Sequence, residues 1–131
     1  MKKTIEKENY LKTLYKLEEK SQSATVTSLA NHFKVSKSTV SNMIKKLMLM
    51  KLVDSGPYKP ILLTKSGKKT AIKVITKHRL IELYLYEKMQ FELDEVHEIA
   101  EEIEHIKNIK FFKRMQKILG HKNIDPHGTI I

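Results

Sequence analysis

Residues 94–106, DEVHEIAEEIEHI, carry the side chains of this chain that are best suited to bind a metal ion. An α-helix turns about 100° per residue, so four side chains of this segment would share one face. They are His97, Glu101, Glu104 and His105. Acids crowded on one face repel one another, and a divalent cation held by the imidazoles and carboxylates would remove that repulsion. A solvated, charged helix face is the alternative interpretation.

A second helical segment lies upstream and carries a similar pair. His78 and Glu82 are four residues apart, so they also fall on one face of a helix. We expect this helix and the one at 94–106 to form the sensing half of the protein. The sequence contains no cysteine, which excludes disulfides and thiolate metal sites.

The charge is divided unevenly along the 131 residues. Residues 1–77 hold 17 lysines and 5 acidic residues, whereas residues 78–131 hold 8 basic and 10 acidic residues. The net charge of the whole chain is +10. This division predicts that the first half binds a polyanion and that the second half attracts cations. No apolar run is long enough to cross a bilayer, and no hydrophobic segment follows the first lysines. We therefore expect a cytoplasmic protein with no signal peptide and no membrane partner.

Residues 27–50 have the pattern of a helix-turn-helix motif. Thr27 is expected to cap a short first helix, and Ser36 a longer second helix that reaches about Met50. Polar residues on the outer face of the second helix are candidates for DNA binding, with hydroxyl and amide groups for base edges and lysines for phosphates. They are Ser36, Lys37, Ser38, Thr39, Ser41, Asn42, Lys45 and Lys46. An ordinary helical hairpin with a polar face is the alternative.

Two short β-type runs follow, at residues 52–54 and 61–64, around the turn-forming sequence SGPYKP. A hairpin in this position is a wing, and its Tyr58 and Lys59 are candidates for contacts with the DNA backbone. Thr64 is then expected to open a long helix that ends near Met89. Residues 78–89 of this helix are apolar on most sides, which predicts burial in a dimer interface.

Two further helices are expected nearer the ends of the chain. Thr4 would cap one over residues 5–20, and Gly120 would end another over residues 109–119. The core residues of the second would be Ile109, Phe112, Met115, Ile118 and Leu119. The tail, HKNIDPHGTII, is predicted to be a loop in which Asp125 and His127 serve turn geometry rather than a metal.

These patterns together predict a mainly α fold with two domains. A winged helix-turn-helix DNA-binding domain would occupy residues 1–72. An all-helical dimerisation and metal-binding domain would follow in residues 73–131.

The order of these motifs resembles the diphtheria-toxin-repressor and manganese-transport-regulator family of metal-dependent transcriptional repressors. The similarity runs from about Glu8 to Gly128. Its strongest parts are YK at 58–59, LT at 63–64 with Gly67, HRLIE at 78–82, and VH, AE and EH at 96–97, 100–101 and 104–105. The resemblance implies a homodimer that binds a double-stranded DNA operator, with Ser36, Ser38, Thr39 and Asn42 facing the bases.

The resemblance also implies two metal sites. One would consist of His78, Glu82 and His97, and the other of Glu101, Glu104 and His105 with help from Asn9. Position 101 is a cysteine in the iron branch of the family and a glutamate in the manganese branch, so Glu101 favours Mn²⁺, with Fe²⁺ second. Ligands from carboxylates and imidazoles agree with that preference.

Two positions depart from the family pattern. Asn9 stands where the family has an aspartate or a methionine, and Lys12 stands where the manganese branch has a glutamate. A neutral amide oxygen is a poorer ligand than a carboxylate, and a lysine ammonium cannot ligate a metal. Some family members have an additional small β-barrel domain at the C-terminus, and we expect none in this chain.

The leading prediction is a metal-dependent DNA-binding transcriptional repressor that controls metal-ion homeostasis genes. We expect it to be neither an enzyme nor a binder of a small organic substrate. Two alternatives remain open. One is a winged-helix regulator for which metal is irrelevant. The other is a carboxylate-bridged dimetal enzyme, because Glu102-x-x-His105 matches half of the motif that such enzymes use, although a second such pair is absent from the sequence.

Overall fold

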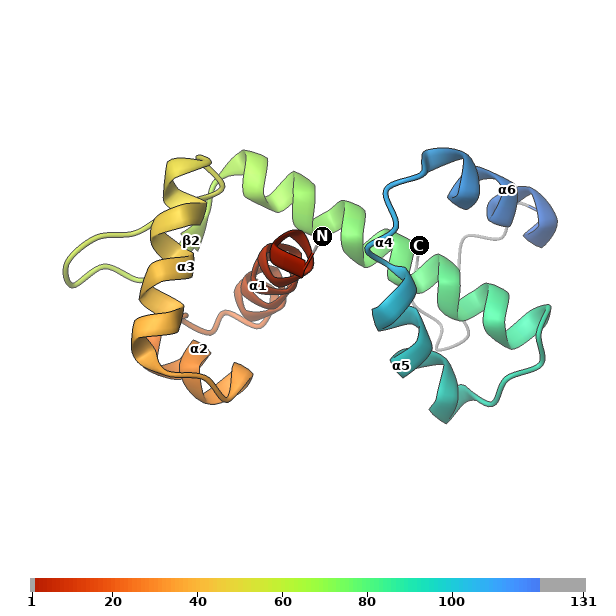
Figure 1. Ribbon diagram of the computed structural model, residues 1–131, viewed down its shortest axis with the longest axis horizontal. Helices are drawn as coiled ribbons and strands as arrows, with labels where there is room; N and C mark the ends of the chain where they lie inside the picture. Colours follow the sequence, from red (N-terminus) through yellow and green to blue (C-terminus); the bar gives the residue numbers. More distant parts are fainter. Residues whose placement is uncertain (1, 121–131) are drawn as a thin grey trace. The chain divides into compact units, whose positions relative to one another are not determined.

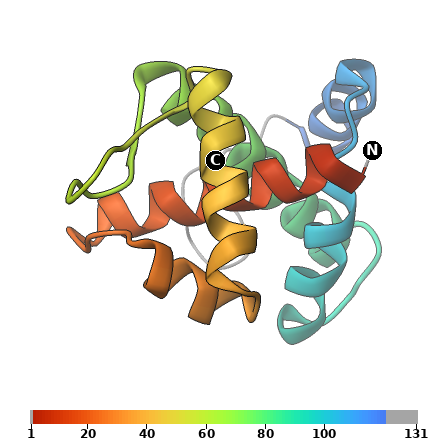
Figure 2. The ribbon, with the colours of Figure 1, turned by 60° about the vertical axis from the view of Figure 1, so that its left-hand side comes forward.

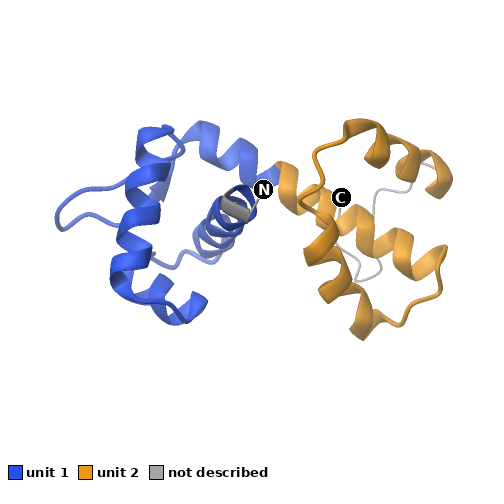
Figure 3. Ribbon diagram, viewed as in Figure 1, with its two compact units in different colours: residues 1–72 blue, residues 73–131 orange. Residues whose placement is uncertain are grey.

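Six helices and one small sheet form residues 2–120, the part of the chain that this computed structural model describes (Figure 1). The elements in chain order are α1 (Lys2–Glu19), α2 (Val26–Phe33), α3 (Lys37–Leu49), β1 (Val53–Asp54), β2 (Leu62–Leu63), α4 (Lys65–Glu87), α5 (Leu93–Ile103) and α6 (Ile109–Leu119). They divide into two units, residues 1–72 and residues 73–131 (Figure 3). The predicted fold class, mainly α with a winged helix-turn-helix, is confirmed. Among the described helices, none combines the length and apolar character that a membrane span requires.

Unit 1 contains the helix-turn-helix formed by α2 and α3, which lie side by side in both ribbon views (Figures 1 and 2). Lys34 ends α2 in the left-handed conformation, with φ 56°, and Ser36 caps α3 as predicted by accepting a hydrogen bond from the amide of Thr39. The facing apolar residues form one core with α1 and the wing. Its large, fully buried side chains are those of Leu11, Leu14, Leu29, Val40 and Leu47.

The predicted start of α2 is wrong by two residues. Thr25, not Thr27, is the cap: its hydroxyl accepts from the Ser28 amide at 3.0 Å, and the Ser28 hydroxyl accepts from the Thr25 amide at 2.9 Å. This reciprocal capping box satisfies two backbone donors that have no partner in the helix. The first helix was also predicted too short, because α1 begins at Lys2 and Thr4 lies within it.

β1 and β2 form the predicted wing as an antiparallel pair, with Val53 opposite Leu63. The wing is fixed to the start of α4 by Thr64, whose amide donates to Leu52 O at 3.0 Å and whose hydroxyl accepts from the Gly67 amide at 3.0 Å. Gly67 must be a glycine here, because an added Cβ would lie 2.0 Å from Leu52 O. The other anchor is Glu18 of α1, which accepts from the Leu63 amide at 2.9 Å.

Unit 2 has its own core, in which the second part of α4 packs against α5 and α6. The buried members are Leu80, Ile81, Leu83, Leu85, Val96, Ala100, Phe112, Met115 and Leu119. The apolar stretch at 78–89 is therefore covered largely by helices of the same chain. The apolar character of this stretch therefore does not by itself require a second copy of the chain, although the sequence had suggested burial in a dimer interface.

Two helix boundaries and two core assignments in unit 2 differ from prediction. Helix α5 begins after Glu92 rather than at Asp94, because the Glu95 carboxylate accepts from the Glu92 amide at 3.0 Å. The helix ends at Ile103 rather than at Ile106. Helix α6 has the predicted bounds, but Ile109 and Ile118 are 67% and 52% exposed. The buried face of α6 consists of Phe112, Met115 and Leu119, and Ile109 and Ile118 lie outside this face. Asp125 and His127 lie outside the described residues.

Candidate metal centre and nucleic-acid interface

Three ligand atoms from two helices of unit 2 converge on one point. Helix α4 places His78 and Glu82 one turn apart, and α5 brings His97 to the same place. His78 Nε2 lies 3.1 Å from His97 Nδ1 and 3.5 Å from Glu82 Oε2, and His97 Nδ1 lies 3.7 Å from Glu82 Oε2. We refer to His78, Glu82 and His97 as the metal triad.

The spacing and the chemistry of the triad fit a bound cation. Nitrogen and oxygen ligands about 2.0–2.2 Å from a shared ion lie roughly 3–3.5 Å from one another, close to the observed separations. Two imidazoles and a carboxylate suit first-row divalent metals such as Mn²⁺ and Fe²⁺. His78 and Glu82 are buried, whereas the His97 side chain is 53% exposed, so an ion can enter from the His97 side.

The other ring nitrogen of each histidine is bound to a carboxylate. His78 Nδ1 lies 2.8 Å from Glu104 Oε1, and His97 Nε2 lies 3.0 Å from Glu101 Oε1. Glu104 is completely buried, whereas half of the Glu101 side chain is exposed. A carboxylate behind each imidazole is the usual arrangement at protein metal sites, because it fixes the orientation of the ring.

The protonation of His78 reflects these neighbours. Burial of the ring acts to lower the pKa of His78, but the hydrogen bonds and negative charges of Glu104 and Glu82 stabilise the imidazolium more strongly. The pKa of His78 therefore lies above its ordinary value of 6.5. A metal ion held at Nε2 of this ring would have to take the place of the proton there.

The structure brings together five of the seven predicted metal residues. Besides the triad these are Glu101 and Glu104, which contact the two histidines. The prediction that His97, Glu101, Glu104 and His105 share one face of a single helix is wrong at its C-terminal end, because α5 stops at Ile103. Glu104 is the cap of that helix, and the half-buried His105 follows in a turn. Asn9 belongs to the other unit, so its part in metal binding stays a prediction.

One of the carboxylate pairings has a local sequence signal and the other has none. His97 and Glu101 are four residues apart on α5, so a contact between their side chains could have been inferred from spacing. His78 and Glu104 are 26 residues apart on different elements. Only the packing of α5 against α4 brings them together, so sequence reasoning missed this contact.

The candidate DNA-binding residues of α3 form a polar, accessible face. Of the eight, Ser41 is half-buried and the others are exposed: Ser36, Lys37, Ser38, Thr39, Asn42, Lys45 and Lys46. The Ser36 and Thr39 hydroxyls lie 2.8 Å apart and cap the helix, so part of their hydrogen-bonding capacity is used within the chain. Ser38 and Asn42 lie one turn apart on this face, which favours contacts with base edges.

The wing presents its two candidates at the tip. Tyr58 has a positive φ of 61° and a fully exposed side chain, and the Lys59 side chain is also exposed. The turn is closed by the Lys59 amide, which donates to Gly56 O at 3.1 Å. An aromatic hydroxyl and an ammonium group at such a tip can both reach phosphate oxygens.

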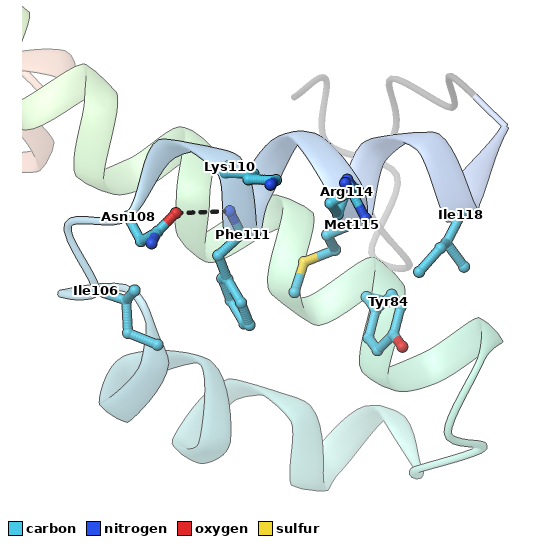
Figure 4. A pocket seen from close by; sticks show the side chains of 8 residues that line it. All are labelled: Tyr84, Ile106, Asn108, Lys110, Phe111, Arg114, Met115 and Ile118. Carbon is cyan, nitrogen blue, oxygen red and sulfur yellow. Dashed lines mark hydrogen bonds between the residues drawn. The ribbon is translucent and has the colours of Figure 1, made fainter.

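A concave surface in unit 2 is mainly apolar and is lined by none of the triad residues. This α6 groove has a volume of about 450 Å³ and is lined by Tyr84, Ile106, Asn108, Lys110, Phe111, Arg114, Met115 and Ile118 (Figure 4). Asn108 caps α6 at its edge by accepting from the Phe111 amide at 3.1 Å. The groove offers no cluster of metal-ligating side chains, but it exposes apolar surface that a protein partner could cover.

The chain thus consists of a winged helix-turn-helix unit followed by a helical unit in which three residues could hold a metal ion. Two family models match the chain: "Iron dependent repressor, N-terminal DNA binding domain" over residues 3–61, and "Iron dependent repressor, metal binding and dimerisation domain" over residues 64–131. The chain belongs to the iron-dependent repressor family.

Individual relatives agree with this assignment. The diphtheria toxin repressor of Corynebacterium glutamicum is 30% identical over 124 residues, which are 95% of this chain and 54% of that protein. An HTH-type transcriptional regulator of Methanocaldococcus jannaschii is 31% identical over 83% of this chain and 88% of its own length. The solved structure of the manganese regulator SloR matches with a TM-score of 0.81 and 40% identity, over 95% of this chain and 58% of that one. The chain thus spans about half the length of the first of these relatives.

Proposed function

We propose that this protein is a metal-dependent DNA-binding transcriptional repressor in the cytoplasm that controls genes of metal-ion homeostasis. The observation that carries the proposal is the course of α4. This one helix begins at the wing of the DNA-binding unit and carries His78 and Glu82 of the metal triad in the other unit. His78 lies only a few helical turns after the start of α4, so a change at the triad acts on the same helix that follows the wing.

The donor set supports Mn²⁺ as the favoured metal, with Fe²⁺ second. His78 and His97 would supply nitrogen and Glu82 oxygen, and no thiolate is present to select a softer ion. The relative SloR is described as a manganese regulator, and other family members as iron-dependent repressors. When bound, the ion would supply positive charge that holds α4 and α5 together at the triad.

Duplex DNA is the proposed partner of unit 1. The exposed face of α3 would enter the major groove, with Ser38 and Asn42 near base edges. Lys45 and Lys46, further along the helix, together with Tyr58 and Lys59 of the wing, would contact phosphates. The net charge of +12 over residues 1–77 supports attraction to the DNA backbone.

A second copy of the chain is the proposed partner of unit 2. The family model that covers this unit is described as a metal-binding and dimerisation domain. Its exposed apolar surface includes the α6 groove, where Ile106 and Phe111 are 38% and 41% exposed (Figure 4). A dimer would present two copies of α3 to a palindromic operator, with half-sites about one DNA turn or a multiple of it apart.

The experiment that tests the proposal measures DNA binding with and without metal. A duplex is first selected from a random-sequence pool in the presence of Mn²⁺ and then labelled for fluorescence anisotropy. We expect Mn²⁺ to tighten binding by roughly 5- to 150-fold, the usual range for coupled sites, and chelation to reverse it. The variant His78→Ala should bind the duplex weakly at all Mn²⁺ concentrations. Equal binding by metal-free and Mn²⁺-loaded protein would reject the metal switch.

A further inference from the structure

The wing of unit 1 is too small to hold its own position. Its two strands pair through two residues each, Val53 with Leu63 and Asp54 with Leu62. An isolated two-stranded hairpin is marginally stable at best in water. The direction in which the tip of the wing points must therefore be set by contacts with the rest of unit 1.

Two such contacts lie on the edge of β2 that faces away from β1. The amides of alternate residues in a strand point to the same edge, and Ile61 and Leu63 are such a pair. The Ile61 amide donates to Ala24 O, in the segment between α1 and α2, at 3.1 Å. The Leu63 amide donates to Oε1 of Glu18, in the last turn of α1, at 2.9 Å. A carboxylate thus occupies the place that a backbone carbonyl of a third strand would take.

Glu18 joins three elements of unit 1. Its second oxygen, Oε2, lies 3.6 Å from Nζ of Lys68 on the first part of α4. The Lys68 side chain is 52% exposed, so this ion pair adds little stability by itself, but it orients the carboxylate toward β2. The Glu18 side chain is only 23% exposed, and a hydrogen bond from an amide to a carboxylate is stronger than one between neutral groups.

We propose that Glu18 is a positioning residue for DNA binding, which holds the wing in the orientation in which Tyr58 and Lys59 reach phosphate oxygens. The inference rests on the proposed binding of duplex DNA by unit 1. Without the carboxylate, the edge of β2 loses one of its anchors, and the tip of the wing would sample several orientations. DNA binding would then have to order the wing, and that cost would appear as lost affinity.

Charge and positioning predict opposite effects of removing Glu18. A carboxylate repels DNA, so its loss by charge alone would strengthen binding. Loss of the wing anchor would weaken binding instead. Glu19 is the matched control, because it carries the same charge at the next position of α1 and its side chain is exposed.

The test measures the affinity of the Mn²⁺-loaded full chain for the selected duplex over a range of salt concentrations. We expect Glu18→Ala to bind about tenfold more weakly than Glu19→Ala, the value of one hydrogen bond to a charged group. The slope of log affinity against log salt should fall by about 1 in Glu18→Ala, because the phosphate contact of Lys59 is lost. Glu18→Gln keeps an acceptor oxygen for the Leu63 amide and should keep the slope of the unaltered chain.

A double-variant comparison separates positioning of the wing from a general loss of stability. Lys59→Ala should lower the salt slope by about 1 in the unaltered chain and produce no further decrease in Glu18→Ala. Equal affinities for Glu18→Ala and Glu19→Ala would overturn the inference. A full additional effect of Lys59→Ala in the Glu18→Ala chain would also overturn it, because the wing would then reach the DNA without Glu18.

A second measurement needs no variant and remains decisive if Glu18→Ala fails to fold. If the contact between Glu18 and Leu63 favours DNA binding, bound DNA must favour that contact by the same factor. Hydrogen exchange of the Leu63 amide in the unaltered chain should therefore slow by roughly 5- to 150-fold with the saturating selected duplex. An unchanged exchange rate with duplex bound would overturn the inference alone. Failure of the unaltered chain to bind any duplex would overturn the proposed function with it.

Discussion

At the scale of single residues, His78 links the metal triad to the packing of unit 2. Its Nε2 faces Glu82 and His97, while its Nδ1 contacts the buried Glu104. In the metal-free protein the ring is stabilised as an imidazolium by two carboxylates, so its pKa is raised above 6.5. Metal binding must displace a proton from this ring, and that requirement makes both metal affinity and stability depend on pH.

Mn²⁺ affinity should rise with pH until the raised pKa of His78 has been passed. Below that pH, each ion that binds must displace the proton on Nε2, so the apparent affinity falls about tenfold per pH unit for a single proton. Calorimetric titrations between pH 6 and pH 8 in two buffers of different ionisation enthalpy would measure both the affinity and the proton released. An affinity that is flat across this range would contradict the role given to His78.

The metal-free protein should respond to pH in the opposite sense. A histidine whose pKa is higher in the folded than in the unfolded state contributes stability that is fully present below the unfolded value, about 6.5. This contribution is lost as the pH rises through the raised pKa of the folded state. The melting temperature of unit 2 should therefore fall with pH in this window without metal. In His78→Gln this dependence should be absent.

At this scale the sequence indicates which side chains could act as ligands more clearly than it indicates which of them meet in the fold. The triad residues and the two carboxylates could all be named from their chemistry and spacing. The contact between His78 and Glu104 could not, because it depends on how the turn after α5 packs against α4. Spacing along a helix reports which residues share a face, but not which face a neighbouring element covers.

At the scale of elements, local capping chemistry decides where the helices begin. The predicted caps are found at the start of α3, where Ser36 accepts from the Thr39 amide, and at the end of α6, where Gly120 takes the left-handed conformation. The start of α2 was predicted at the wrong threonine, since the segment SATVTS offers two. Thr25 prevails because Ser28, three residues later, can return a hydrogen bond to it.

Alanine substitution at the two threonines should separate their roles. Thr25→Ala removes the side-chain acceptor of the Ser28 amide and should lower the free energy of unfolding by about 0.5–2 kcal/mol. Thr27→Ala, within the first turn of α2, changes an exposed side chain with no role in this cap and should change stability little. Urea denaturation of both variants measures the difference. A larger loss for Thr27→Ala would contradict the observed cap.

At the scale of the whole molecule, the two units have separate cores and share one helix. α4 continues across the boundary between residues 72 and 73, with its basic first part in one unit and the candidate ligands His78 and Glu82 in the other. The division of charge along the chain matches this organisation, with lysines gathered before the boundary and acids after it. This level of organisation could be inferred from composition, because charge and apolar patterning are averaged over many residues.

Dimerisation should be sensitive to charge placed in the α6 groove. Ile106→Lys adds a further positive charge to a groove that Lys110 and Arg114 already line. It should raise the monomer–dimer dissociation constant at least tenfold, because an apolar contact is lost and one more unpaired charge would have to be buried beside like charges. Leu62→Lys is a matched control, since Leu62 is similarly exposed but lies in the wing of unit 1. Sedimentation equilibrium measures both variants. A dimer as tight as that of the unaltered chain would show that this groove is not the interface.

The most direct test of the account is the reciprocal measurement of metal affinity with DNA present. If Mn²⁺ at the metal triad strengthens DNA binding, saturating DNA must strengthen Mn²⁺ binding by the same factor. We predict an increase of roughly 5- to 150-fold in Mn²⁺ affinity when the selected duplex is added, and none with a scrambled duplex. An Mn²⁺ affinity that is unchanged by the selected duplex would show that the two units act independently and would contradict the proposed function.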